Sequence, residues 1–296
     1  MELKSVKSVN ALFLLVLIIN LFLGSAIMPY FPAAAADYLP QFLFILLPAL
    51  VFIKLRKKSF KETLRLNAIG LIDILILILI TFAMNPLINF IASLSTVIFG
   101  DSMSILFADV QNYTLAKMIF TIGITPAICE EVIMRGVILD GYRGMSIRKA
   151  ALMNGFLFGI FHMNFNQFSY AFLMGIVLTY VVYATDSLFA GIVVHFVNNT
   201  WSSLTTAIDH PALNLVNNIL NTTGGPIGIL MVVLSVLITA MLVHLLIERN
   251  AKEERFFQPE KAGQKCFDWT VWISIGLFLL SSIFLSIVAS IGSAFM

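Results

Sequence analysis

The residues best suited to chemistry are Glu130, Glu131 and Arg135, three ionisable side chains inside the apolar run 119–139. A charge near the centre of a bilayer is costly, so such a cluster indicates a functional site. At 3.6 residues per turn, Glu131 and Arg135 share one helix face and can form an ion pair, whereas Glu130 points about 100° away. Glu130 must therefore find its partner on another helix.

Two later apolar runs contain candidate partners. Phe158 and His162 are spaced as Phe-x-x-x-His, and His195 and Asn199 as His-x-x-x-Asn, one helical turn apart. A rise of about 1.5 Å per residue places these groups at a depth similar to that of Glu130, near the middle of the ~30 Å hydrocarbon layer. Buried polar groups without partners are costly. We therefore expect the three helices to converge around a small water-filled cavity.

Two carboxylates, two histidines and an amide suit hydrolysis by an activated water molecule. In one mechanism Glu130 with His162 takes a proton from the water, and His195 with Asn199 donates hydrogen bonds to the oxyanion. In the other, Glu131 with His162 and His195 binds zinc, whose open position holds the water. The sequence demands no cofactor, and the residue types leave both mechanisms open.

The composition excludes several classes of protein. With 59% hydrophobic and 11% charged residues, the chain is expected to be an integral, multi-pass membrane protein in contact with the lipid bilayer. A net charge of +2 without basic clusters among aromatic residues gives no support for nucleic-acid binding. Cys129 and Cys266 are expected to stay free thiols.

The predicted fold is an all-α polytopic membrane protein with about nine transmembrane helices and a cytoplasmic N-terminus. Sixteen of the eighteen Lys and Arg residues then fall on the inner side, as cytoplasmic loops require. The first run could be a signal peptide, but its length favours a retained helix. The nine runs are approximately 9–29, 38–55, 70–99, 114–140, 147–163, 167–184, 187–205, 225–247 and 269–294.

Three regions are predicted along the chain. Residues 1–111 hold helices 1–3 with an interfacial helix at 57–66, residues 112–205 hold a core of four helices, and residues 206–296 hold helices 8–9 with a cytoplasmic loop at 248–268. Pro86 and Pro126 are expected to kink or break the third and fourth helices.

The ordered set Glu130-Glu131-x-x-x-Arg135-Gly136, Phe158-x-x-x-His162 and His195-x-x-x-Asn199 resembles the three motifs of a family of intramembrane endopeptidases. This is the CAAX prenyl protease 2 and bacteriocin-processing family, abbreviated CPBP and also called Abi. The resemblance covers about residues 112–205 and implies peptide-bond hydrolysis. Its members are often named metalloproteases.

The resemblance also assigns roles. It implies that Glu130 is the base, that Glu131 is required, that Arg135 and Phe158 give structural support, that His162 assists the water, and that His195 with Asn199 serves the oxyanion. The implied partner is a peptide or protein substrate in or at the membrane. The compact inner loops favour a bacterial cell membrane, while the oligomeric state stays open.

Two other functions fit the same residues. A noncatalytic immunity or scaffold protein could use this fold to bind a partner. A proton-coupled transporter could place Glu and His at the bilayer midplane, but the absence of an internal sequence repeat argues against it.

Overall fold

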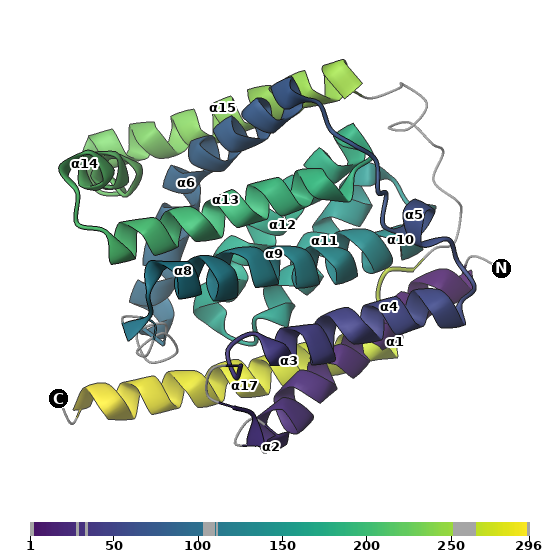
Figure 1. Cartoon of the computed structure of the whole chain (residues 1–296). Helices are drawn as coiled ribbons and strands as arrows, with labels where there is room; N and C mark the ends of the chain where they lie inside the picture. Colours follow the sequence, from purple (N-terminus) through teal and green to yellow (C-terminus); the bar gives the residue numbers. More distant parts are fainter. Residues whose placement is uncertain are drawn as a thin grey trace.

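The computed structural model describes residues 3–27, 30–32, 35–102, 110, 112–250 and 265–294. Within these ranges the chain is helical and contains no strand, as predicted. In Figure 1 the segment labelled α8 to α10 and helices α11, α12 and α13 lie in the middle of the bundle. Helices α6 and α15 cover one side of this group, and α1, α4 and α17 lie along the other.

Each of the nine apolar runs forms a helical segment over its described residues, and π-helical turns labelled η interrupt three of these segments. The bounds are α1 Leu3–Ile18, η1 Ile19–Gly24 and α2 Ser25–Ile27; α3 Leu39–Gln41, η3 Phe42–Leu46 and α4 Leu47–Leu55; α5 Phe60–Thr63; α6 Leu71–Phe99; α8 Leu115–Met118, η5 Ile119–Ile124, α9 Thr125–Glu131, η6 Val132–Ile138 and α10 Leu139–Gly141; α11 Ile147–Phe161; α12 Phe165–Thr185; α13 Leu188–Ala207; α14 Pro211–Leu220; α15 Gly225–Asn250; and α17 Trp269–Ala294.

Five of these segments are long and apolar enough to cross a membrane by length and composition. The segment Leu39–Leu55 is a shorter apolar helix, and α11 has 15 residues. Nine crossings therefore stay a prediction. The five segments are Val6–Gly24, Leu71–Phe99, Phe165–Thr185, Gly225–Asn250 and Trp269–Ile291.

Neither Pro86 nor Pro126 breaks its helical segment. Helix α6 runs through Pro86, and the Ser235 hydroxyl of α15 donates to the Ala83 carbonyl at 2.6 Å and accepts from the Leu87 amide at 3.2 Å. Ser235 thus bridges the backbone groups that Pro86 separates. Pro126 instead follows the π-helical turn η5, at the start of α9.

Two connecting regions differ from the expectation. Only the four residues Phe60–Thr63 of the predicted interfacial helix 57–66 are helical, and Lys57 and Arg65 on either side have positive φ angles of 51° and 49°. The helix α14 lies between the predicted runs 187–205 and 225–247, where no helix was expected, and its Leu215, Val216 and Ile219 are exposed. Of the predicted loop 248–268, residues 251–264 lie outside the described ranges.

Ion pairs connect the helix ends that the distribution of Lys and Arg predicts to lie on the inner side of the membrane. Lys58 and Arg143 both pair with Asp140. Arg249 Nε lies 3.2 Å from Asp73 Oδ1. At the opposite end, Lys117 Nζ lies 2.6 Å from Asp37 Oδ2. Helix ends predicted to share one side of the membrane therefore contact one another.

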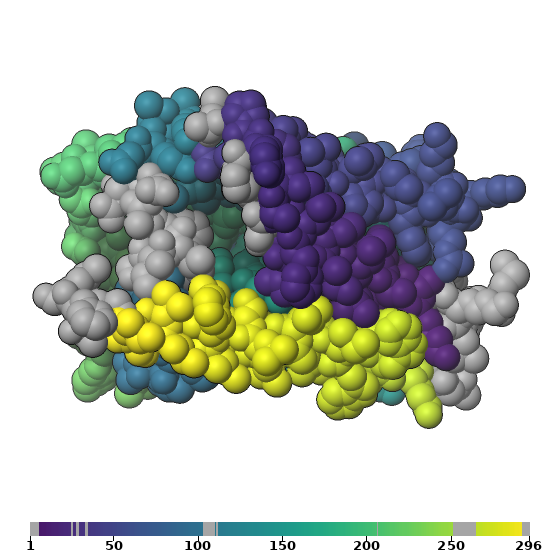
Figure 2. Space-filling model, turned by 90° about the horizontal axis from the view of Figure 1, so that it is seen from below, coloured from purple at the N-terminus to yellow at the C-terminus, as the bar shows by residue number. Residues whose placement is uncertain are grey.

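The first and last helices lie side by side. Figure 2 shows the yellow helix α17 running along the same face as the purple helix α1. The Asn10 amide donates to the Cys266 carbonyl at 3.1 Å and to Asp268 Oδ2 at 3.0 Å. These hydrogen bonds thus join the first helix to the residues just before the last one. Among the described residues, neither Cys129 nor Cys266 forms a disulfide.

Helices α11 and α12 pack with almost no space between their backbones. A Cβ atom on Gly155 would lie 2.7 Å from the Phe172 carbonyl oxygen, and one on Gly175 would lie 2.6 Å from the Gly155 Cα atom. Only glycine permits this approach. This close packing positions the turn at His162 that follows α11.

Candidate active site

A buried ion pair lies at the centre of the bundle. Arg135 Nη1 donates to Glu131 Oε1 at 2.8 Å, and both side chains have no exposed surface. The guanidinium carbon lies 4.3 Å from the centre of the Phe158 ring, and Nη2 donates to the Gly175 carbonyl at 3.3 Å. The Glu131–Arg135 pair predicted from helical spacing is present, and Phe158 supports it.

The same carboxylate holds His195 of α13. His195 Nδ1 lies 3.0 Å from Glu131 Oε1, and the histidine is 3% exposed. Gly191, one turn earlier in α13, leaves room for this contact, because a Cβ there would lie 2.5 Å from Glu131 Oε2. Glu131 thus fixes the imidazole ring instead of facing the cavity.

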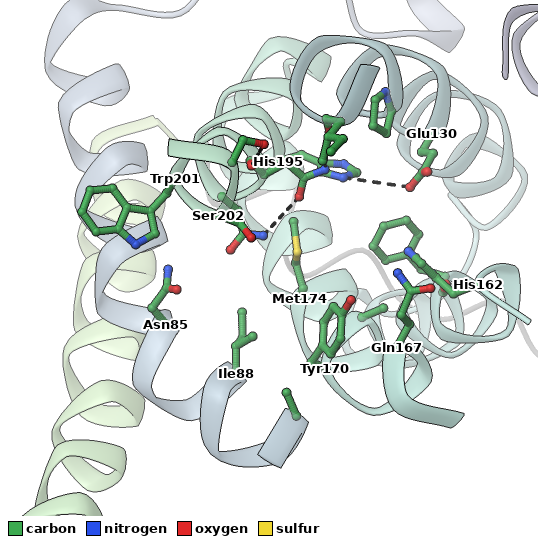
Figure 3. Close-up of a pocket in the computed structure, with 18 of the residues that line it drawn as sticks. Asn85, Ile88, Glu130, His162, Gln167, Tyr170, Met174, His195, Trp201 and Ser202 are labelled. Atoms are coloured by element: carbon green, nitrogen blue, oxygen red, sulfur yellow. Dashed lines mark hydrogen bonds and ion pairs between the residues drawn. The ribbon is translucent and has the colours of Figure 1, made fainter. Parts of the chain in front are cut away.

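Glu130 points away from this pair, as the helical spacing predicts. Its Oε2 atom lies 4.0 Å from His195 Nε2, as the dashed line between them in Figure 3 marks. Among the described residues no group hydrogen-bonds to Glu130 Oε2, although this atom is buried. Glu130 therefore presents a carboxylate oxygen that is available to another molecule.

A cavity of about 590 Å³ lies between α6, α12, α13 and the segment α8 to α10. Four of the five predicted catalytic side chains line it: Glu130, His162, His195 and Asn199. The predicted convergence of three helices on a cavity is therefore present. The fifth, Glu131, is outside the lining. Further residues of the wall are Asn85, Ile88, Phe158, Gln167, Tyr170, Met174, Asn198, Trp201 and Ser202.

His162 ends helix α11 and faces the cavity. Its Nδ1 atom lies 2.9 Å from the Phe158 carbonyl oxygen. A carbonyl can only accept, so Nδ1 carries the hydrogen and the neutral ring has its lone pair on Nε2. The same reasoning applies to His195, whose Nδ1 donates to the Glu131 carboxylate. In its neutral form, each of the two histidines thus offers an acceptor at Nε2.

The Asn199 side chain hydrogen-bonds to a backbone carbonyl. Pro126 has no N–H group, so the Ile122 carbonyl four residues earlier lacks its usual helical donor. Asn199 Nδ2 donates to this carbonyl at 2.9 Å, and its Oδ1 accepts from Asn198 Nδ2 at 3.2 Å. Asn199 therefore joins α13 to the π-helical turn η5 while it lines the cavity.

The connector after α5 fixes the inner half of the same segment. Arg65 is 5% exposed, and its Nη1 donates to the Arg135 carbonyl at 2.9 Å. Its Nε lies 3.6 Å from Asp186 Oδ1, and its own carbonyl accepts from the Leu188 amide at 3.1 Å. Desolvation by burial lowers the pKa of Arg65. The Arg65 side chain thus connects the loop before α6 to η6 and to the turn before α13.

The residues named for zinc do not form a ligand set. Among the described residues no group of three His, Cys, Asp or Glu side chains is placed to hold a metal ion. Glu131 Oε1 is already engaged by Arg135 and His195. A catalytic zinc site needs three such ligands with open geometry, so Glu131, His162 and His195 do not fit one.

Several residues of the cavity wall were not found from the sequence. Gln167 and Tyr170 lie one turn apart at the start of α12, and Asn198 precedes Asn199. Asn85 lies in the middle of α6. Each of them is a polar residue in an apolar run, which is the signal the sequence offered. A turn separates His162 from Tyr170, and the sequence does not show the geometry of this turn.

A helical membrane protein with a buried carboxylate and two imidazoles around a cavity fits the class of membrane-embedded hydrolases. Residues 111–201 match the model of a family described as type II CAAX prenyl endopeptidase, Rce1-like. The match includes all three motifs, so the resemblance is confirmed, and it implies a peptide hydrolase in an integral membrane protein. No curated protein and no solved structure matches the chain.

Proposed function

We propose that this protein is an intramembrane endopeptidase that hydrolyses a peptide bond of a membrane-associated or lipidated peptide or protein. The observation that carries the proposal is the pair of acceptors Glu130 Oε2 and His195 Nε2, 4.0 Å apart in a buried cavity. The expected location is a bacterial cell membrane, with the substrate held in or at the bilayer.

The separation of these two acceptors suits a water molecule. A distance of 4.0 Å is too long for a direct hydrogen bond. Since Glu130 carries no other hydrogen bond at Oε2 among the described groups and His195 offers a lone pair, water can donate one hydrogen to each. Its oxygen lone pairs are then directed toward a substrate carbonyl.

The reaction follows from this arrangement. The water oxygen attacks the carbonyl carbon, the C=O π electrons move to the oxygen, and Glu130 takes the proton that water loses. Collapse of the tetrahedral intermediate breaks the C–N bond, and the protonated Glu130 returns the proton to the departing amine. Glu131 and Arg135 keep the His195 ring in the tautomer that accepts from water.

This division of roles differs from the one the motifs imply. The resemblance assigns the water to Glu130 with His162 and the oxyanion to His195 with Asn199. We assign the shared water to Glu130 and His195 because their acceptor atoms face each other. His162 Nε2 faces the same cavity and can accept from the substrate amide or the water network.

Cleavage by purified protein tests the proposal. A series of membrane-anchored peptides in liposomes is incubated with the wild type, and the cut position is mapped by mass. We expect cleavage that is lost in Glu130→Gln and His195→Gln. Glu248→Gln, whose side chain is 68% exposed, serves as the matched control and should keep full activity. Full activity of Glu130→Gln would overturn the assignment.

A further inference from the structure

The proposed hydrolysis needs a hydrogen-bond donor for the developing oxyanion. In their neutral forms the two histidines offer acceptors at Nε2, and one hydrogen of Asn199 Nδ2 is used by the Ile122 carbonyl. The wall of the cavity opposite these residues contains a better candidate. Figure 3 shows Tyr170 and Gln167 on α12, facing the space beside Glu130 and His195.

A chain of hydrogen bonds fixes the side chain of Gln167. Asn164, which is 1% exposed, donates from Nδ2 to the His162 carbonyl at 2.8 Å and to Gln167 Oε1 at 2.6 Å. Its Oδ1 accepts from the Gln167 backbone amide at 2.8 Å. Because Gln167 Oε1 is the acceptor for Asn164, the amide nitrogen of Gln167 points the other way.

Figure 3 shows the Gln167 amide beside the Tyr170 side chain, and both residues line the cavity. An amide nitrogen can only donate, so where it approaches the phenol oxygen it leaves the phenol hydrogen free to donate elsewhere. Glu130 lines the same cavity. The contacts of Asn164 therefore hold Gln167 beside Tyr170, whose hydroxyl is an O–H donor in the wall of the cavity that contains Glu130.

We propose that the Tyr170 hydroxyl donates a hydrogen bond to the carbonyl oxygen of the scissile peptide and stabilises its negative charge in the tetrahedral intermediate. No proton is transferred from the phenol. The charge forms when water attacks and the π electrons move to the oxygen, and it disappears when the C–N bond breaks. Gln167 and Asn164 act as positioning residues for this donor. The inference rests on the proposed endopeptidase activity.

Tyr170→Phe tests the assignment, since it removes only the hydroxyl. Loss of one oxyanion donor lowers kcat by about 100- to 1000-fold in enzymes where it has been measured. We expect a fall in kcat of this order with KM changed less than about threefold. Tyr180→Phe is the matched control, because Tyr180 lies on the same helix outside the described cavity lining. It should keep wild-type kcat.

Gln167→Met keeps the test decisive if Tyr170→Phe does not fold. This variant leaves the phenol in place but lets it rotate, and we expect a smaller fall in kcat, about tenfold, again with little change in KM. Thermal unfolding of each purified variant checks the fold. Wild-type kcat in a folded Tyr170→Phe, or a loss that appears only in KM, would overturn the role of Tyr170 and leave the endopeptidase standing. A wild-type protein that cleaves no peptide would overturn both.

Discussion

His195 Nδ1 and Glu131 Oε1 lie 3.0 Å apart, although the two residues are 64 positions apart in the chain. Because of this contact, the adjacent residues Glu130 and Glu131 have different surroundings. Glu131 Oε1 contacts both Arg135 and His195, and Glu131 is outside the cavity lining, whereas Glu130 lines the cavity and has no described hydrogen bond at Oε2. The consequences can be separated by measuring stability and activity on the same variants.

Glu131→Gln should lower both activity and stability. It leaves the Arg135 guanidinium buried without its partner, which typically costs about 3–5 kcal/mol of unfolding free energy. Glu130→Gln should abolish activity with a change in unfolding free energy below about 1 kcal/mol, since no described hydrogen bond is lost at Oε2. Denaturant unfolding in detergent checks both. Equal stability of the two variants would contradict the separate roles.

Gly191→Ala should displace the Glu131 carboxylate. The added Cβ would lie 2.5 Å from Oε2, so the carboxylate must move and His195 loses its position. We expect kcat to fall by about 10- to 100-fold, because small misplacements in an active site cost this much. Gly276→Ala is the control, since no atom lies within 4 Å of its Cβ position. Unchanged kcat in Gly191→Ala would show that the contact is not needed.

Pro126 and Asn199 should be energetically coupled. Asn199→Ala removes the side-chain donor to the Ile122 carbonyl and should cost about 1–3 kcal/mol of unfolding free energy. In a Pro126→Ala background the new backbone N–H can satisfy this carbonyl, so Asn199→Ala should cost clearly less. A double-mutant cycle on unfolding free energies measures the difference. Additive effects of the two substitutions would mean that Asn199 does not replace the missing helical bond.

Chelation should leave the activity intact. Glu131, His162 and His195 do not form a three-ligand set, and the Glu131 carboxylate is held by Arg135. We therefore expect wild-type turnover after dialysis against a strong chelator, with substoichiometric zinc by elemental analysis. Loss of activity that zinc alone restores would require a different arrangement of these side chains.

The sequence predicts the part of the site that helical spacing determines. Glu131 and Arg135 are four residues apart, so their ion pair follows from one helix, and depth alone brings His162 and His195 to the level of Glu130. The contact of Glu131 with His195 depends on a missing side chain at Gly191 of another helix. No pattern within one segment shows such a dependence.

The fold shows the same division. Apolar runs locate the helical segments, because burial in lipid and within the bundle selects for the same residues. The short helix α14 was missed, because a ten-residue amphipathic segment is too brief to stand out from a polar loop. The role proposed for Tyr170 was also missed, since it depends on the hydrogen bond between Asn164 and Gln167, which only the folded turn creates.

Arg65 sets a limit on how this protein can be divided. The family match begins at residue 111, yet the Arg135 carbonyl inside it receives its hydrogen bond from Arg65. A fragment limited to residues 111–201 would expose that carbonyl and leave Asp140 without Lys58. Residues 111–201, which contain the three motifs, therefore depend on contacts from outside this range. Any chimera or shortened version must include the connector before α6 together with residues 111–201.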